Sequence, residues 1–147
     1  NPEVFLYDLK GKKLKQICKN GYFGQIVGKY IAIQTISSSG KSGMTLYRKS
    51  DGQKIKTITS NCSYYEFIDN TFYYVEPIAE FKYKIKSYNI EKKKTITYGT
   101  IKANEFGAIT SKYLYYSNGP MIGECKYYKY SFAKKKSIRI TEEAFQY

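Results

Sequence analysis

The sequence predicts an all-β repeat protein, either a β-propeller or a fragment of one, built from four-stranded antiparallel blades of about 41 residues. The first observation is a repeated context around Tyr7, Tyr47, Tyr88 and Tyr130, which lie 40, 41 and 42 residues apart. Each tyrosine precedes a polar turn, a lysine cluster and a short β-branched run. The second observation is that no segment of ten or more residues has the periodicity of an amphipathic helix. A fixed period of this length is typical of propellers and other repeat architectures.

The composition is that of a folded, basic, strand-forming chain. Of the 147 residues, 42% are hydrophobic and 18% are aromatic, with 18 Tyr, 8 Phe and no Trp. Tyrosine and phenylalanine favour strands because their rings pack well on a half-buried pleated surface. The formal net charge of +13 favours anionic partners such as nucleic acid, acidic lipid or an anionic polymer.

The repeat divides the chain into blades of one repeat domain, 1–147. Residues 1–17 supply a half blade, which consists of the last two strands of a repeat. Three full blades are expected, at 22–58, 64–98 and 104–140. Residues 143–147 begin a further strand, which brings the expected number of strands to fifteen.

Each full blade has four expected strands in a fixed order. The first is a short apolar run, at 23–27, 65–68 and 106–109. The second is apolar on both faces, which suggests burial between neighbouring sheets, at 29–33, 71–75 and 112–116. The third carries the repeating tyrosine and forms a hairpin with the fourth, at 55–58, 95–98 and 137–140, with 14–17 in the half blade. The Asp51-Gly52 pair is a strong hairpin signal, because glycine tolerates positive φ.

Propellers usually close with four to eight blades, so the chain is expected to be part of a longer propeller. Two alternatives stay open. The two ends meet to complete a fourth, three-stranded blade, or two chains close one ring together. Self-association that covers open blade edges is a further expectation.

Two segments resemble bacterial propeller repeats related to YWTD domains. They are Tyr113 to Gly119 followed by Lys126 to Tyr130, and Leu46-Tyr47-Arg48 followed by the Asp51-Gly52 turn. The resemblance implies a propeller scaffold that binds partners, often at the cell envelope or outside the cell. It implies no catalytic residues.

Residue chemistry favours a binding module over an enzyme. The chain has no His, so it cannot assemble a Ser-His-Asp or Cys-His catalytic apparatus or a His-based zinc site. Three scattered cysteines do not form a structural zinc site, and we predict no catalytic residue, metal or cofactor. No run approaches the roughly 18 apolar residues of a membrane span. The alternative is a glycan-active enzyme that uses a carboxylate pair drawn from Glu76, Glu80 and Glu124.

Two candidate binding regions follow from the propeller interpretation. The first is a face formed by the 34–43, 75–83 and 117–126 loops, because loops on a rigid scaffold often carry recognition. Its predicted ligand-binding residues are Lys41, Glu76, Glu80, Asn118 and Glu124. The expected partner is a protein or an anionic polymer.

The second candidate region is a basic rim at the opposite ends of the hairpins. Its predicted anion-binding residues are Lys12, Lys13, Lys54, Lys93, Lys94, Lys135 and Lys136. The rim favours a nucleic acid or another anionic polymer. The competing interpretation is that these lysines protect exposed edge strands against aggregation.

Overall fold

The computed structural model describes residues 3–7, 13–18, 21–119 and 124–141, and all fourteen of its elements are β-strands. This confirms the all-β class and the four-stranded antiparallel sheets. The fifteenth expected strand, at 143–147, lies outside the described residues. By its internal contacts the chain forms two compact units, residues 1–62 (unit 1) and 63–147 (unit 2). The single repeat domain inferred from the sequence stays a prediction.

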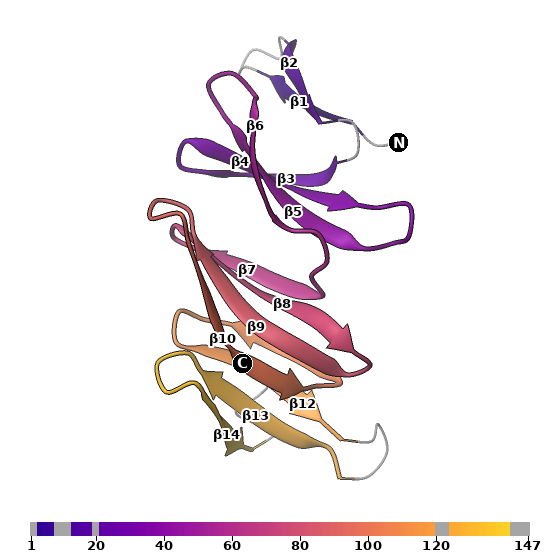
Figure 1. The fold of residues 1–147 in the computed structure, drawn as a ribbon, viewed down its shortest axis with the longest axis vertical. Helices are drawn as coiled ribbons and strands as arrows, with labels where there is room; N and C mark the ends of the chain where they lie inside the picture. The colour runs from indigo at the N-terminus through magenta and orange to yellow at the C-terminus, as the bar shows by residue number, and fades with distance from the viewer. Residues whose placement is uncertain (1–2, 8–12, 19–20, 120–123, 142–147) are drawn as a thin grey trace. The chain divides into compact units, whose positions relative to one another are not determined.

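Unit 1 contains two sheets (Figure 1). The two-stranded sheet pairs β1 (Val4–Tyr7) with β2 (Lys13–Cys18). The four-stranded sheet consists of β3 (Gly21–Val27), β4 (Tyr30–Ile36), β5 (Ser42–Arg48) and β6 (Lys54–Thr59). Its strands pair in chain order, so every connection is a local antiparallel turn.

Unit 2 contains two further four-stranded sheets, which also pair in chain order. The first consists of β7 (Tyr64–Ile68), β8 (Thr71–Ala79), β9 (Lys82–Asn89) and β10 (Lys94–Lys102). The second consists of β11 (Glu105–Ile109), β12 (Tyr113–Asn118), β13 (Lys126–Ser131) and β14 (Lys136–Ile140). Strand β10 runs four residues beyond the expected end at 98, because Ile101 joins the core and is 5% exposed.

The sequence repeat has a structural counterpart in the backbone. In each four-stranded sheet, the residue directly after the third strand donates its backbone N–H to a carbonyl oxygen in the turn between the first and second strands. These bonds are Lys49 N to Lys29 O (2.9 Å), Ile90 N to Asn70 O (2.8 Å) and Phe132 N to Lys112 O (3.2 Å). Donors and acceptors both recur at spacings of 41 and 42 residues, so each repeat ties its two turns together in the same way.

Aromatic side chains form the core of unit 2, between sheet β7–β10 and sheet β11–β14. The Tyr64 ring stacks on Phe106 with 5.4 Å between centroids, and the Tyr64 hydroxyl donates to the Gly107 carbonyl at 3.1 Å. Tyr73 stacks on Phe132 at 4.8 Å, while Tyr83 meets Phe106 edge-on. The aliphatic members of this core are Val75, Ile85, Ile101, Ile109 and Leu114.

Unit 1 has a smaller aliphatic core. Ile17 from β2 is buried with Ile31 and Ile33 from β4, and Val4 and Tyr47 pack against them. Burial of this set joins the two-stranded sheet to sheet β3–β6.

We predict that Leu114→Ala lowers the free energy of unfolding by about 2–5 kcal/mol, because Leu114 is 0% exposed between the two sheets of unit 2. Urea denaturation followed by circular dichroism measures the change. The matched control is Ile78→Ala, since Ile78 is 48% exposed and its truncation leaves no buried cavity. A loss at position 114 no larger than at position 78 would contradict the assigned core.

We also predict that the protein loses stability as pH rises above about 10. Burial raises the pKa of Tyr116 above its ordinary value of 10.0; a hydrogen bond with Ser137 lowers the pKa by less, and the Tyr128 and Tyr130 phenols raise it. Burial likewise raises the pKa of Tyr130, with a further contribution from Tyr98. The unfolded chain therefore releases these protons first, so each rise in pH favours unfolding.

Urea midpoints between pH 8 and 11 test this alkaline instability. The double variant Tyr116→Phe, Ser137→Ala removes the phenol together with the hydroxyl that bonds it, so no buried group loses its partner. Its stability should fall less steeply over this range than that of the unchanged protein. Equal slopes would show that Tyr116 does not contribute.

Candidate functional site

The hairpin turns that link the third and fourth strands of each sheet carry exposed lysines. Lys54, Lys94 and Lys136 are the first residues of β6, β10 and β14, while Lys93 and Lys135 lie in the turns before β10 and β14; all five are exposed. The two turns of unit 2 lie at the same end of that unit (Figure 1). Of the other predicted rim residues, Lys12 lies outside the described residues and Lys13 begins β2.

Lys93 and Lys135 hold their turns in a left-handed conformation. Their φ angles are 53° and 52°, and Gly52 has φ 70° at the equivalent point of the β5–β6 turn. Short hairpin loops often need one residue in this region, which glycine adopts without a steric penalty. The lysines therefore occupy backbone positions that a glycine would fill at lower cost.

A cavity of about 430 Å³ opens beside the β9–β10 turn of unit 2. Its lining comes from β8, β9, β10 and the turn between the last two. The strand register places Tyr73, Ser87 and Ile96 in one row across the sheet, with Thr71, Asn89 and Lys94 in the next row of the same face. The complete lining is Thr71, Tyr73, Ser87, Asn89, Lys92, Lys94, Thr95, Ile96 and Tyr98. We call this lining the unit 2 cavity.

The aromatic floor of the unit 2 cavity is held in place by its neighbours. The Tyr98 hydroxyl and the Ser87 hydroxyl share a hydrogen bond of 2.8 Å. Phe132 packs on both Tyr73 and Tyr98, at 4.8 and 5.0 Å, so the β13–β14 turn starts beside the cavity. Burial raises the pKa of Tyr73, and Tyr98 and Asp69 raise it further.

The basic edge of the unit 2 cavity is fixed by its own turn. The Asn89 side chain accepts a hydrogen bond from the Lys92 backbone N–H at 2.9 Å, which orders the start of the turn. Lys92 and Lys94 then stand exposed on the lining. Rings, hydroxyls and ammonium groups are thus gathered in one hollow, and this set suits a ligand that has both flat faces and negative charge.

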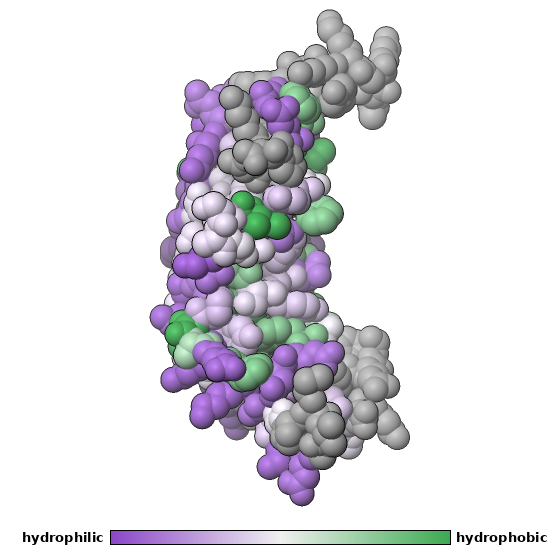
Figure 2. Space-filling model, turned by 90° about the vertical axis from the view of Figure 1, so that its right-hand side faces the viewer, coloured by the Kyte–Doolittle hydropathy of each residue, from purple (hydrophilic) through white to green (hydrophobic). Residues whose placement is uncertain are grey.

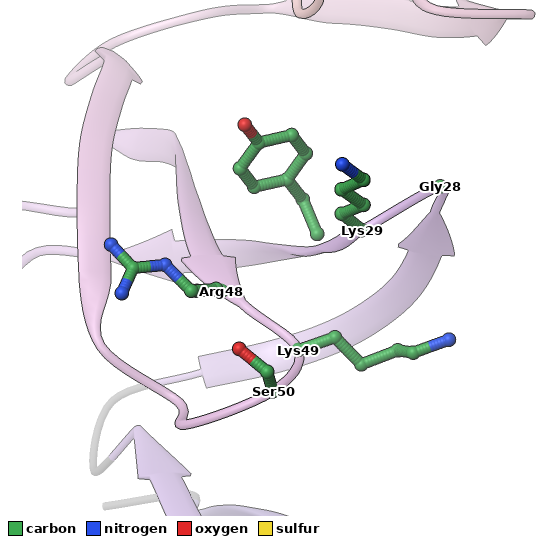
Figure 3. Close-up of a pocket in the computed structure, with 6 residues that line it drawn as sticks. Gly28, Lys29, Arg48, Lys49 and Ser50 are labelled. Carbon is green, nitrogen blue, oxygen red and sulfur yellow. The ribbon is translucent and has the colours of Figure 1, made fainter.

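A second cavity, of about 300 Å³, lies at the equivalent turns of unit 1 (Figure 3). It is lined by Gly28, Lys29, Tyr30, Arg48, Lys49 and Ser50, and we call it the unit 1 cavity. Three of these six residues are cationic. The backbone bond from Lys49 N to Lys29 O holds the two turns together beneath it.

The residues of the predicted ligand face are divided between unit 1 and unit 2. Glu76 forms an ion pair with Lys86 across β8 and β9, at 2.7 Å, with both side chains 24% exposed. Glu80 is exposed in the β8–β9 turn, Glu124 is exposed before β13, and Asn118 ends β12 half-buried. Lys41 is exposed in unit 1. Figure 2, which views the side of the β8–β9 turn, shows hydrophilic side chains over much of the visible surface and hydrophobic ones in small groups.

Among the described residues, no three His, Cys, Asp or Glu side chains gather in a group able to hold a metal ion. No helix that would reach across a lipid bilayer occurs in that part of the chain.

Of the residues that line the two cavities, the sequence predicted only Lys94 as a binding residue. Arg48 directly follows the repeating Tyr47, and Tyr73 and Tyr98 appear in the sequence only as strand aromatics. Their convergence depends on register and on the twist of the sheets, which no spacing reveals. The available signal was that cations and aromatics recur at the same end of the repeat.

No protein-family model matches this chain, and no curated protein matches it at a significant level.

The left-handed lysines lead to a further prediction. Lys93→Gly should raise the free energy of unfolding by about 0.5–1 kcal/mol, because relief of the left-handed strain exceeds the added chain entropy of glycine. The matched control is Lys92→Gly, since Lys92 is not in the positive-φ region. Urea unfolding should show a gain at position 93 and none at position 92; a loss at both would mean that position 93 is not strained.

Proposed function

We propose that this protein is a non-catalytic binding module that holds an anionic polymer at the hairpin-turn end of its sheets. The observation that carries the proposal is the unit 2 cavity, where Tyr73 and Tyr98 form a floor and Lys92 and Lys94 stand on the edge. Stacking on tyrosine rings combined with attraction by lysines is the recognition mode of proteins that bind single nucleic acid strands or charged chains.

The charges around the cavity support an anionic partner. Lys93 lies between Lys92 and Lys94 where the β9–β10 turn meets β10. Phe132, which packs on the cavity floor, is followed closely by Lys134, Lys135 and Lys136. With a formal net charge of +13, the whole chain also attracts anions over a distance. Contacts of this kind release counterions, so the affinity should fall steeply as salt is added.

The scaffold proposed for this module is a β-propeller, with blades of the kind found in repeats related to YWTD domains. Three four-stranded sheets with the same backbone bond between their turns support the repeat. Strand β8 carries Tyr73 on one face and Phe72 and Tyr74 on the other, as a blade between two neighbours would. The proposed location is the cell envelope or the extracellular space.

The carboxylate-dependent enzyme is kept as the alternative proposal, with Glu76 in an ion pair with Lys86 and with Glu80 and Glu124 exposed. The loop face of Glu80, Asn118 and Glu124 remains a proposed site for a protein partner. It carries exposed carboxylates, which suit a basic partner surface rather than an anionic polymer.

Charge reversal at the cavity edge tests the proposal. In the double variant Lys92→Glu, Lys94→Glu, the affinity for a fluorescent single-stranded oligonucleotide or for a sulfated polysaccharide should fall by about tenfold or more. The slope of log affinity against log salt should also become shallower by about 1–2, since each lysine contact that is lost removes one released counterion. Fluorescence anisotropy at several salt concentrations measures both quantities.

The matched control reverses two exposed lysines at the other end of the strands. Lys102 ends β10 and Lys126 begins β13, so Lys102→Glu, Lys126→Glu has the same net charge as the test variant. This control should retain most of the affinity. Equal weakening in both variants would reject a localised site and leave only a general attraction by charge.

A further inference from the structure

The unit 1 cavity has a cationic lining that the polymer proposal does not use. Lys29 comes from the β3–β4 turn, whereas Arg48, Lys49 and Ser50 come from the end of β5 and the turn that follows. Figure 3 shows Arg48 and Lys49 extending in opposite directions from the chain, with Lys29 on the facing turn. The cavity therefore has cations on both turns rather than a single cluster at a hairpin tip.

Arg48 forms an ion pair with an aspartate of its own turn. Its Nη1 lies 2.9 Å from Oδ2 of Asp51, and the two side chains are 45% and 41% exposed. The other carboxylate oxygen, Oδ1, accepts a hydrogen bond from the Gln53 backbone N–H at 3.1 Å. The turn thus fixes a carboxylate against the guanidinium, in the place of an external counter-ion.

The wall of the cavity next to Arg48 is an aromatic ring. Tyr30 lies directly opposite Arg48 in the β4–β5 register and is half-buried, so its side chain is on the same face. The backbone at both turns is fixed by bonds from Lys49 N to Lys29 O and from Arg48 N to Gln53 O, at 2.9 and 2.8 Å. The cations therefore project from turns whose geometry is already set.

We infer that the unit 1 cavity binds a tetrahedral oxyanion, carried as a phosphate or sulfate ester. A guanidinium presents a fork of N–H donors that matches two oxygens of such a group, and Lys29 and the Ser50 hydroxyl add further donors. A volume of about 300 Å³ is at the lower limit for ligand pockets, so it takes one charged unit rather than a polymer segment. Asp51 acts as an internal competitor that the ligand displaces from Arg48.

Titration of the isotope-labelled protein with inorganic phosphate and with inorganic sulfate tests this site. Amide chemical shifts of residues 28–30 and 48–53 should change in a saturable way, while chloride at equal ionic strength should cause no saturable change. Arg48→Gln should weaken phosphate binding about tenfold, and Arg48→Lys should weaken it less, because charge is kept and the fork is lost. Lys41→Gln removes the same charge from an exposed position outside the lining and should have little effect.

The variant that separates this inference from simple charge attraction is Asp51→Asn. Asparagine keeps the oxygen that accepts from Gln53 and removes the ionic partner of Arg48. Phosphate binding should tighten by about two- to fivefold, as expected for loss of an exposed competing ion pair. Unchanged affinity in Asp51→Asn, or an equal loss in Arg48→Gln and Lys41→Gln, would overturn the inference.

Two further experiments show which ester the unit 1 cavity binds and whether it acts independently of the unit 2 cavity. Comparison of a sugar phosphate and a sugar sulfate with the inorganic ions shows which ester the Tyr30 wall favours. Tighter binding of either ester supports the site, and weaker binding of both overturns the ester assignment. Lys92→Glu, Lys94→Glu should leave phosphate binding intact, so failure of the polymer proposal and failure of this inference are distinguishable.

Discussion

Aromatic packing between sheet β7–β10 and sheet β11–β14 is the interaction on which unit 2 depends. Each sheet pairs its strands only in chain order, so the contacts that join the two sheets come from the side chains packed between them. Stacking of Tyr64 on Phe106 and of Tyr73 on Phe132 buries large rings from both sheets at once. The phenol oxygens stay satisfied at the edges of this core, as in the bond from Tyr64 to the Gly107 carbonyl. A tyrosine-rich sequence can therefore build a core without leaving polar atoms unpaired.

The same packing positions the proposed binding surface. Phe132 directly follows β13 and begins the turn that carries the lysines, and it packs on Tyr73 and Tyr98, which form the floor of the unit 2 cavity. The core of unit 2 and the unit 2 cavity therefore share side chains. A substitution that loosens the packing of Phe132 on Tyr73 should also displace the lysines of the neighbouring turn. A rigid hairpin end reduces the side-chain entropy lost when a charged chain binds.

The lysines of the hairpins serve two physical purposes that do not conflict. On the outer strands β6, β10 and β14 they place charge on edges that would otherwise pair with another chain. At the turns, the same charge creates positive potential next to rings and hydroxyls. In unit 1 the positive charge at the turn is smaller, because Asp51 forms an ion pair with Arg48. The ligand inferred for the unit 1 cavity must therefore compete with a carboxylate.

The sequence by itself determined the strands, their order and the antiparallel hairpins, because the repeat around Tyr47, Tyr88 and Tyr130 and the alternation of side chains are local properties. It also located the exposed lysine turns. Only the tertiary structure decided that Glu76 pairs with Lys86, that Tyr73 and Tyr98 meet Phe132, and that Arg48 faces Tyr30 beside a cavity. Those outcomes depend on register across strands and on which faces of two sheets come together, and neither is encoded in the spacing of any single segment.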